Sequence, residues 1–391
     1  MEASEIRKKF LSFFETREHV IVPSSSLLPD DPSVLLTTAG VQQFKKYYTG
    51  EADPLRDFGS VNVASLQKCF RTSDIDEVGD ETHNTFFQML GNFSFGGYFK
   101  REAITHAHDF ITHEMGLAIS YVSIFKGGGG VPRDEESRAI WQSLGITDIR
   151  EEGIEDVFWG PTGNGGPCGP TTEIYCKNAE GQKVEIWNIV FNEFMCSGSR
   201  EELLAGAATL TPLEKKGIDT GMGLERLAMI VQGKNTIFGT DLFAPYMELL
   251  PPGLDMRHQR IIIDHLRGSA FLLADGVRPS NKEAGYVLRR LMRRTLVYEH
   301  IYRIPAHVYD AVLHDLLHEY GDFYSALMRE AEMIRGEFSK ERARFGVSIA
   351  RGIRELEALA AREPVNGANA FHIYETFGLP YEIIKELAAE R

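Results

Sequence analysis

Residues 68–98, KCFRTSDIDEVGDETHNTFFQMLGNFSFGGY, decide the fold. An extended run ends near Arg71, a polar and acidic loop follows, and an apolar run of strand length returns at residues 85–90. This pattern predicts two strands joined by a loop, with an arginine near the end of the first strand. An always-charged guanidinium binds phosphate and carboxylate oxygens in a bidentate manner, and Phe87 on the return strand offers a flat surface for a base. The stretch is therefore typical of a nucleotide-binding hairpin.

A second stretch, DTGMGLER at residues 219–226, leads into an apolar helical run. Gly221 and Gly223 allow the backbone to approach a ligand closely. Arg226 lies on the first turn of the expected helix, where it could cover the other side of a base. Either stretch alone is weak evidence of a nucleotide site, but in this order the two support each other.

The two stretches resemble motifs 2 and 3 of the class II aminoacyl-tRNA synthetases. Further segments resemble the alanyl-tRNA synthetase family within that class: FFQMLGNFSFGGYFK, GPCGPTTEIY, EIWNIVF, DTGMGLERL, AFLLADGVRPSN and GYVLRRLMRR. They follow the family order between Glu5 and about Pro380. The resemblance implies an enzyme that converts alanine and ATP to alanyl-adenylate, with Mg²⁺ as cofactor, and then transfers alanine to the 3′ end of tRNA(Ala).

The composition limits the class of protein. With 391 residues, of which 43% are hydrophobic, the chain can bury one or two large cores. A net charge of −14 argues against a wholly basic surface, so an RNA ligand requires a local basic patch. The four cysteines lack CxxC spacing, which predicts free thiols and no zinc site. Without a signal segment or a long apolar run, the chain is expected to be cytoplasmic.

Short strands alternate with helices up to residue 241, which predicts an α+β fold with a largely antiparallel sheet flanked by helices. The expected strands include residues 20–22, 34–38, 121–125 and 184–194. Beyond residue 241 little strand signal remains, and residues 242–391 are expected to be all-helical. The resemblance implies that residues 1–241 form the catalytic domain of a class II synthetase and that residues 242–391 recognise the tRNA acceptor stem.

The resemblance also assigns the residues that activate alanine. Arg71 matches the arginine that contacts the α-phosphate of ATP and the substrate carboxylate, and Arg226 matches the one that covers adenine and reaches the γ-phosphate. Both are therefore catalytic candidates. Phe87 is the candidate for the opposite face of adenine, with an ordinary core position as the alternative. Gly223 would leave room beside the nucleotide.

Oxygen ligands suit Mg²⁺, and Glu185 is placed as the metal-facing acid of the family, with Asn188 as a lesser candidate. Alanine needs a carboxylate for its ammonium group, and Asp219 matches that residue. The resemblance places the following residues around the substrate: Trp159 and Val190 as walls of the methyl pocket, Gly221 and Arg71 beside the amino acid, and Glu173 behind them.

The RNA candidates lie in the helical part. Arg289, Arg290, Arg293 and Arg294 are spaced to form a basic stripe on one helix face. From spacing alone, a solvated face and an RNA-binding face are equally consistent; the resemblance favours RNA phosphates. The family reads a G·U pair with an Asn and an Asp. Asn281 matches the first and is also suited to cap a helix, whereas Glu375 stands at the second position, one methylene longer.

The paired histidines with downstream Cys and His that the family uses for editing are not found. The resemblance implies a fragment without the editing and C-terminal domains, and because the C-terminal domain supports dimerisation in the family, a monomer is expected. His314 and His318 have i,i+4 spacing, but surface or core roles are favoured over half a metal site. Two alternative functions stay open. One is an alanine-activating enzyme with a non-tRNA acceptor, and the other is a non-catalytic tRNA-binding module, which the intact set of Arg71, Asp219 and Arg226 disfavours.

Overall fold

Nine strands pair into one sheet in the computed structural model, which describes residues 1–30 and 34–389. The strands are β1 Val20–Ile21, β2 Asn62–Phe70, β3 Phe86–Ser94, β4 Tyr121–Phe125, β5 Ile149–Glu152, β6 Phe158–Trp159, β7 Gly166–Lys177, β8 Lys183–Cys196 and β9 Leu210–Gly223. Their order is β1-β2-β3-β9-β8-β7-β4-β5, with β6 on β7. The pairs β3–β9, β9–β8, β8–β7 and β7–β4 are antiparallel, while β1–β2 and β4–β5 are parallel. The predicted largely antiparallel sheet is confirmed.

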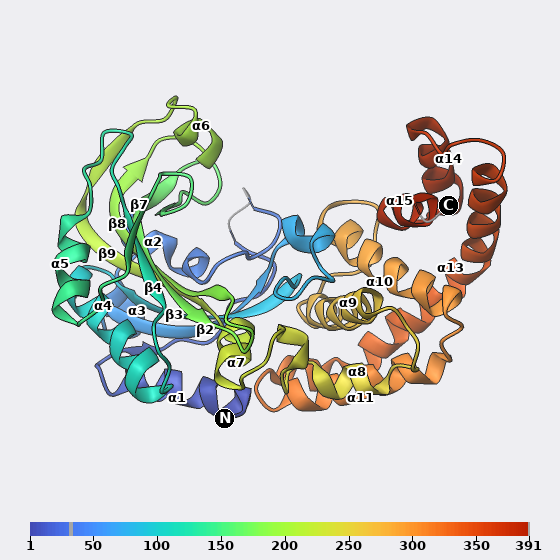
Figure 1. Cartoon of the computed structure of the whole chain (residues 1–391), viewed down its shortest axis with the longest axis horizontal. Helices are drawn as coiled ribbons and strands as arrows, with labels where there is room; N and C mark the ends of the chain where they lie inside the picture. The colour runs from blue at the N-terminus through green and yellow to red at the C-terminus, as the bar shows by residue number, and fades with distance from the viewer. Residues whose placement is uncertain (31–33, 390–391) are drawn as a thin grey trace. The chain divides into compact units, whose positions relative to one another are not determined.

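The chain divides into two compact units (Figure 1). One consists of Met1–Cys69 and Phe87–Leu242 and contains nearly all of the sheet. The other consists of Phe70–Phe86 and Phe243–Arg391. The second unit therefore includes the segment between β2 and β3 together with the helices that follow residue 242.

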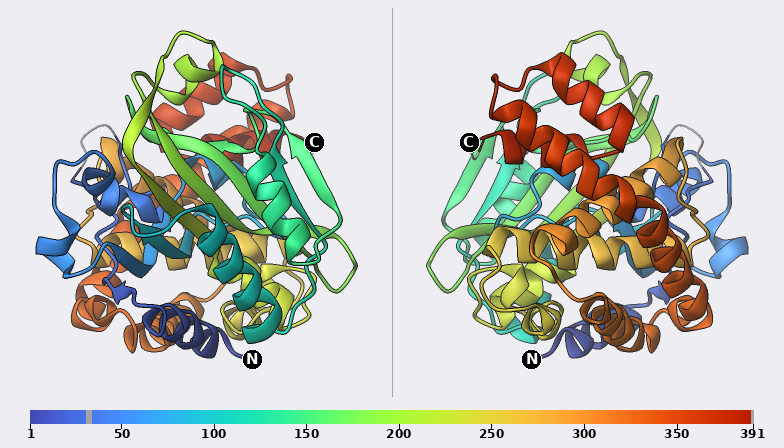
Figure 2. Two further views of the ribbon diagram at one scale, coloured as in Figure 1. Left: turned by 90° about the vertical axis from the view of Figure 1, so that its left-hand side faces the viewer. Right: turned by 90° about the vertical axis from the view of Figure 1, so that its right-hand side faces the viewer.

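Helices cover the sheet of the first unit. They are α1 Ala3–Glu15, α2 Lys45–Tyr48, α3 Pro54–Phe58, α4 Lys100–Asp109 with a π-helical turn at Phe110–Glu114, α5 Glu135–Ser143, α6 Arg200–Leu204 and α7 Leu224–Val231. On one face of the sheet, Trp187 of β8 packs its ring 6.0 Å from Phe10 of α1 and 5.8 Å from Phe110. Figure 2 shows the teal helices α4 and α5 beside the long green strands. The other face carries an apolar cluster around Met89, Phe93 and Phe44.

The prediction of a strand at residues 34–38 is wrong, because these residues form no strand in the structure. The amide of Thr37 donates to the carbonyl of Leu27 and its hydroxyl to that of Ser26. The side-chain oxygen of Gln42 accepts from the amide of Ala39 and from the hydroxyl of Thr38. Because these donors bond to the carbonyls of Leu27 and Ser26 and to the side chain of Gln42, the segment does not need a neighbouring strand.

Residues 243–389 contain helices and connections and no strand, as expected from the sequence. The helices are α8 Ala244–Leu249, α9 Met256–Ala274, α10 Glu283–Ile301, α11 Ala306–Gly321, α12 Ser325–Arg329, α13 Ala331–Ala360, α14 Gly367–Phe377 and α15 Tyr381–Ala389. α9 is buried on all sides from Ile261 to Leu273, which makes it the central helix of this unit. Among the described residues, no helix has both the length and the apolar character that a membrane span requires.

Candidate active site

Strand pairing brings the predicted alanine-binding residues Val190 and Asp219 to one face of the sheet, together with the Mg²⁺ candidate Asn188. Val190 of β8 lies opposite Asp219 of β9, and Asn188 lies opposite Gly221 on one side and Glu173 of β7 on the other. Directly opposed residues, and alternate residues along a strand, share a face. The side chains of Glu173, Asn188, Val190 and Asp219 therefore surround the position that Gly221 leaves open.

Asp219 is the most unusual group on this face. Its side chain is only 5% exposed and makes no hydrogen bond to any residue in the described part of the chain. Burial raises the pKa of its carboxyl to about 8. A buried carboxylate is costly unless a cation or hydrogen bonds compensate it. An ammonium group bound beside Asp219 would supply that compensation.

Small and apolar groups limit the space beside this acid. A Cβ atom on Gly221 would lie 3.0 Å from the sulfur of Met89, so any larger residue there would displace Met89. Trp159 of β6 and Phe87 both pack, partly buried, against the cluster that contains Met89. Sequence reasoning missed Met89; its signal was its position two residues after Phe87 on the same strand face.

Glu173 holds a hydrogen-bond network on this face. It accepts from the hydroxyl of Ser123 at 3.1 Å, from that of Tyr175 at 2.8 Å and from Nδ2 of Asn188 at 3.0 Å. Burial, followed by the nearby charge of Glu185, raises the pKa of Glu173 to about 7. Asn188 thereby uses its donor, while its buried Oδ1 has no partner among the described residues. This oxygen remains available as an acceptor for a ligand.

The direct junction between β9 and α7 positions Arg226. Gly223 is the N-cap of α7 and lies opposite Met89 of β3. The buried carboxylate of Glu225 accepts from the backbone and side-chain amides of Gln88, which fastens the first turn of α7 to β3. Arg226 on the same turn donates to Glu185 at 3.1 Å. The predicted metal-facing acid and the predicted adenine-covering arginine thus form an ion pair, in which both side chains are about one-third exposed.

Arg71 lies in the second unit, directly after β2. Its backbone amide donates to the carbonyl of Thr85 at 2.9 Å, which closes the segment between β2 and β3. Arg71 is also the N-cap of the short 3-10 helix Thr72–Asp76. Its side chain is half-buried. The role of Arg71 in binding ATP remains a prediction from the sequence motif.

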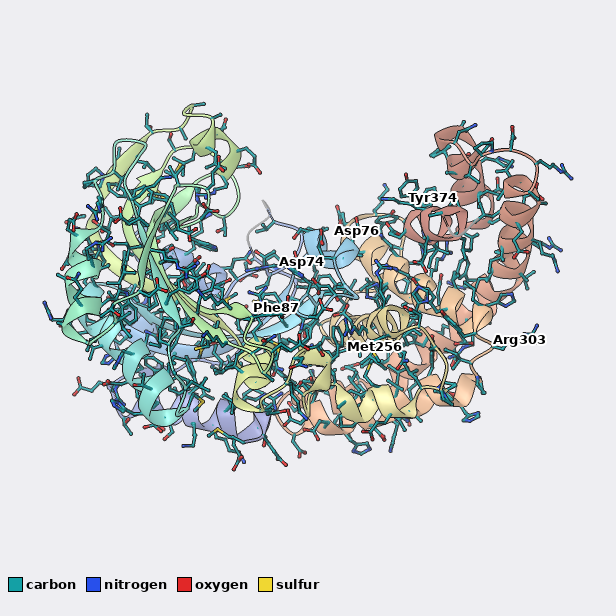
Figure 3. The ribbon with its side chains drawn as sticks, in the orientation of Figure 1. Asp74, Asp76, Phe87, Met256, Arg303 and Tyr374 are labelled. Carbon is teal, nitrogen blue, oxygen red and sulfur yellow. The ribbon has the colours of Figure 1, made fainter. Side chains whose placement is uncertain are left out.

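Five of the six predicted RNA-contacting residues line one groove of about 370 Å³ in the second unit. We call it the arginine groove, and its lining is Asn281, Tyr286, Arg289, Arg290, Arg293, Tyr374, Glu375, Gly378, Pro380, Tyr381 and Glu382. The hydroxyls of Tyr286 and Tyr374 lie 3.2 Å apart across it, and Figure 3 labels Tyr374. The groove therefore combines arginines, acids and three aromatic rings.

The prediction that Arg294 belongs to the basic stripe on one helix face is wrong. Its side chain is 1% exposed, donates to the carbonyl of Ile75 at 3.0 Å and lies 3.2 Å from Nε2 of His265. Successive residues of a helix are separated by about 100° of arc. Arg293 therefore still faces the groove, whereas Arg294 has turned into the helical core.

The groove arginines already have partners. Arg289 donates to Asn281, Arg290 to Asp76 and Glu382, and Arg293 to Glu341. Asn281 does not cap α10: the N-cap is Lys282, without a side-chain cap, and Ser280 accepts from the amide of Lys282. The side chain of Asn281 is therefore directed to Arg289 in the groove.

Within residues 1–30 and 34–389, no group of three or more His, Cys, Asp or Glu side chains is placed to hold a metal ion. The rings of His314 and His318 lie 4.5 Å apart, and His314 also contacts Arg335. All four cysteines are free and buried.

Comparisons with known proteins agree on one family. A family model described as tRNA synthetases class II (A) matches residues 5–391. The alanine–tRNA ligase of Rubrobacter xylanophilus is 41% identical over all of this chain and 47% of its own length. Those of Borrelia hermsii and Treponema pallidum are 38% and 37% identical, over 70% and 69% of their lengths. A solved histidyl-tRNA synthetase from S. aureus matches 58% of this chain and 65% of its own, at 13% identity and a TM-score of 0.39, too low to support an argument.

The chain spans about half the length of the Rubrobacter relative and about two thirds of the length of the spirochaete relatives. The identity extends over the whole chain, and the family model covers it from residue 5 onward. These matches agree with the resemblance carried by the motifs around Arg71 and Arg226. The chain therefore belongs to the class II aminoacyl-tRNA synthetase family, and within it to the alanine–tRNA ligases.

Proposed function

We propose that this chain catalyses the reaction of an alanine–tRNA ligase. The observation that carries the proposal is the buried carboxyl of Asp219 beside the space at Gly221, a carboxyl that makes no hydrogen bond within residues 1–30 and 34–389. A ligand for this place should carry one cation and little bulk. Alanine fits, because its ammonium group would pair with Asp219 while its methyl group packs against Val190.

In the proposed reaction, a carboxylate oxygen of alanine attacks the α-phosphorus of ATP, and pyrophosphate leaves. A hydroxyl of the terminal adenosine of tRNA then attacks the activated carbonyl carbon, and AMP leaves. The sequence motifs assign Arg71 and Arg226 to the phosphates, where fixed positive charge would stabilise the transition state. Asp219 would hold the amino acid, so that its carboxylate is directed to the phosphorus.

The residues around Glu185 fit a magnesium ion that accompanies ATP. Glu185 is about one-third exposed, and the Oδ1 of Asn188 has no hydrogen-bond partner among the residues that the structure describes, so two oxygen donors of the kind that Mg²⁺ prefers are available. When bound, the ion would neutralise charge on the phosphates. Glu185 would exchange its contact with Arg226 for this ion, which would release Arg226 to the nucleotide.

The pocket would discriminate among amino acids by size. Bulkier substrates would collide with Val190 and Met89 around Gly221. Glycine lacks only the methyl group, so the pocket would reject it by only about 1–3 kcal/mol.

We further propose that the arginine groove binds the acceptor stem of tRNA(Ala) at its G·U pair. Arg289, Arg290 and Arg293 would contact phosphates, and Asn281 and Glu375 would reach the base pair. The support for this role is that these residues, far apart in sequence, line one groove. Direct involvement of Arg294 is not part of the proposal, because its side chain is buried.

The test is charging of an acceptor-stem minihelix with a G·U pair, beside the same RNA with G·C, and alanine-dependent ATP–pyrophosphate exchange. We expect exchange, and charging of the G·U minihelix alone. Exchange without charging would instead favour an alanine-activating enzyme with another acceptor. RNA binding without exchange would favour a non-catalytic module and overturn the proposal.

A further inference from the structure

The segment between Arg71 and β3 is fastened to the helices of its own unit. At its end, the backbone amide of Thr85 donates to Oδ1 of Asp264 at 2.9 Å, and its hydroxyl donates to Oδ2 at 2.7 Å. Asp264 lies on α9 and is fully buried. A carboxylate that accepts two hydrogen bonds in the interior is a strong and specific anchor.

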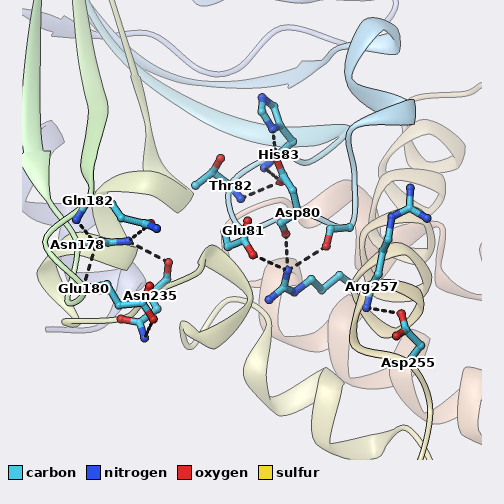
Figure 4. Close-up of polar contacts among 12 residues, drawn as sticks. Asp80, Glu81, Thr82, His83, Asn178, Glu180, Gln182, Asn235, Asp255 and Arg257 are labelled. Atoms are coloured by element: carbon cyan, nitrogen blue, oxygen red, sulfur yellow. Dashed lines mark hydrogen bonds and ion pairs between the residues drawn. The ribbon is translucent and has the colours of Figure 1, made fainter.

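Two arginines hold the middle of the segment by its backbone. Nη1 of Arg294 on α10 donates to the carbonyl of Ile75 at 3.0 Å. Nη1 of Arg260 on α9 donates to the carbonyls of Gly79 and Asp80, both at 2.9 Å. The amides of Thr82 and His83 turn back to the carboxylate of Asp80 (Figure 4). The segment that begins at Arg71 therefore follows α9 and α10.

One further contact differs from these anchors because it is exposed and ionic. Oδ1 of Asp76 accepts from Nη2 of Arg290 at 3.0 Å, and the side chain of Asp76 is 67% exposed. The same nitrogen contacts Glu382 of α15, whose side chain is 16% exposed. Arg290 and Glu382 line the arginine groove. Arg290 is therefore shared between the groove and the segment that starts at Arg71.

We propose that Arg290 is a positioning residue that couples the arginine groove to the segment after Arg71, by exchanging Asp76 for an RNA phosphate. The coupling rests on the proposed function, because it takes the groove ligand to be RNA and takes Arg71 to bind ATP. A phosphate competes well for a guanidinium, which it can bind through two oxygens. An exposed ion pair such as Asp76–Arg290 is weak and easily replaced. The more buried Glu382 would keep Arg290 in the groove during the exchange.

The chain offers a matched control for Asp76. Asp74 lies on the same 3-10 helix, and its Oδ1 accepts from the hydroxyl of Ser73 at 2.7 Å. Replacing either acid by asparagine removes one negative charge from the same surface with almost no change in shape. Figure 3 labels both residues. A difference between the two variants reports the contact with Arg290 rather than net charge.

The first experiment measures binding of the G·U minihelix by fluorescence anisotropy. Asp76→Asn should tighten binding by about 1.5- to 5-fold relative to the unmodified chain, the range expected when one exposed ion pair no longer competes. Asp74→Asn should change binding less. In an Arg290→Ala background, Asp76→Asn should have no further effect. Two results would contradict the replacement of Asp76 by an RNA phosphate. One is an equal change in minihelix affinity in both asparagine variants, and the other is a change caused by Asp76→Asn that persists in the Arg290→Ala background.

The second experiment measures the KM for ATP in alanine-dependent pyrophosphate exchange, with and without the minihelix. Saturating minihelix should raise this KM by about 1.5- to 5-fold, because the segment at Arg71 loses one contact. In the Asp76→Asn variant, the KM for ATP should already be raised in the absence of the minihelix. Adding the minihelix should not change this KM further. A KM for ATP in pyrophosphate exchange that does not change when the minihelix is added would overturn the coupling. If the unmodified chain has no exchange at all, the proposed function fails, whereas the binding cycle with Arg290→Ala still decides whether phosphate replaces Asp76.

Discussion

The face around Asp219 and the arginine groove are both candidate sites for charged ligands, but they are built in opposite ways. Asp219 is buried and has no partner in the described residues, with its pKa raised to about 8. Arg289, Arg290 and Arg293 each already contact an acid or an amide. A ligand at the first place supplies a missing partner, whereas a ligand at the second must replace existing partners. The face around Asp219 should therefore contribute most of the affinity for the amino acid. Binding in the arginine groove should be weaker per contact and more sensitive to salt.

The largest effect is expected from Asp219→Asn, which tests whether this acid is the missing half of an ion pair. Loss of a buried charge partner costs about 3–5 kcal/mol. The kcat/KM for alanine in pyrophosphate exchange should therefore fall by about 100- to 1,000-fold or more. The KM for ATP should change little. An Asp219→Asn variant with alanine kinetics within tenfold of the unmodified chain would remove the central argument for alanine.

The same acid should also set a pH dependence of stability. A carboxyl in the unfolded chain titrates near 4, whereas burial raises the pKa of Asp219 to about 8 and that of Glu173 to about 7. Between these values the folded state binds more protons, so the free energy of unfolding should decrease as pH rises, by up to about 1.4 kcal/mol per unit and group. Urea unfolding between pH 5 and 8 measures the slope. Asp219→Asn should flatten it, and an unchanged slope would contradict the assignment.

Arg294→Met and Arg293→Met distinguish the buried from the groove arginine. Arg294→Met should lower the free energy of unfolding by about 2–4 kcal/mol, because the carbonyl of Ile75 loses its buried donor. Arg293→Met should also lower the free energy of unfolding, because the carboxylate of Glu341, which is 5% exposed, loses its partner. Unlike Arg294→Met, it should weaken minihelix binding and reduce the salt dependence of binding by about one counterion. Urea unfolding and binding titrations at several salt concentrations measure the two effects. If Arg293→Met and Arg294→Met had the same minihelix affinity and the same free energy of unfolding, both arginines would have to lie on the surface.

Gly221→Ala tests the space beside Asp219. The added Cβ would approach the sulfur of Met89 to 3.0 Å, and Met89 would have to move into the pocket. The KM for alanine should rise by about 5- to 20-fold, a cost on the scale of one methyl group in a tight pocket, with little change for ATP. Gly239→Ala is the control, since its nearest neighbour would be 3.7 Å away. Similar kinetics in both variants would show that Gly221 does not border the substrate.

The smallest effect is expected from Glu375→Asp, which introduces the residue that the family resemblance implies at this position. Glu375 is exposed at the edge of the groove and belongs to its lining. One better-placed hydrogen bond is worth about 0.5–1.5 kcal/mol. The ratio of charging between G·U and G·C minihelices should therefore rise by about 2- to 10-fold. A lower ratio in the variant would mean that the longer side chain of Glu375 discriminates better between G·U and G·C in this groove.

The sequence by itself determined the α+β class, the antiparallel sheet and the helical region, because strand and helix periods are local properties of the chain. Motif resemblance also assigned Asp219 and Val190 to alanine and Asn188 to Mg²⁺, and β8–β9 pairing brings the three residues to one face. The prediction of a strand failed at residues 34–38, where an apolar run resembles a strand but the carbonyl of Leu27 and the side chain of Gln42 accept from nearby backbone amides.

Only the tertiary structure decided which charges are buried and which are paired. Spacing could not separate Arg293 from Arg294, because a helix face is defined by what packs against it, and here α10 turns Arg294 toward Ile75 and His265. The sharing of Arg290 between Asp76 and Glu382 joins residues more than 200 positions apart in one case. Burial and long-range pairing depend on contacts between distant segments, which no local pattern in the chain contains.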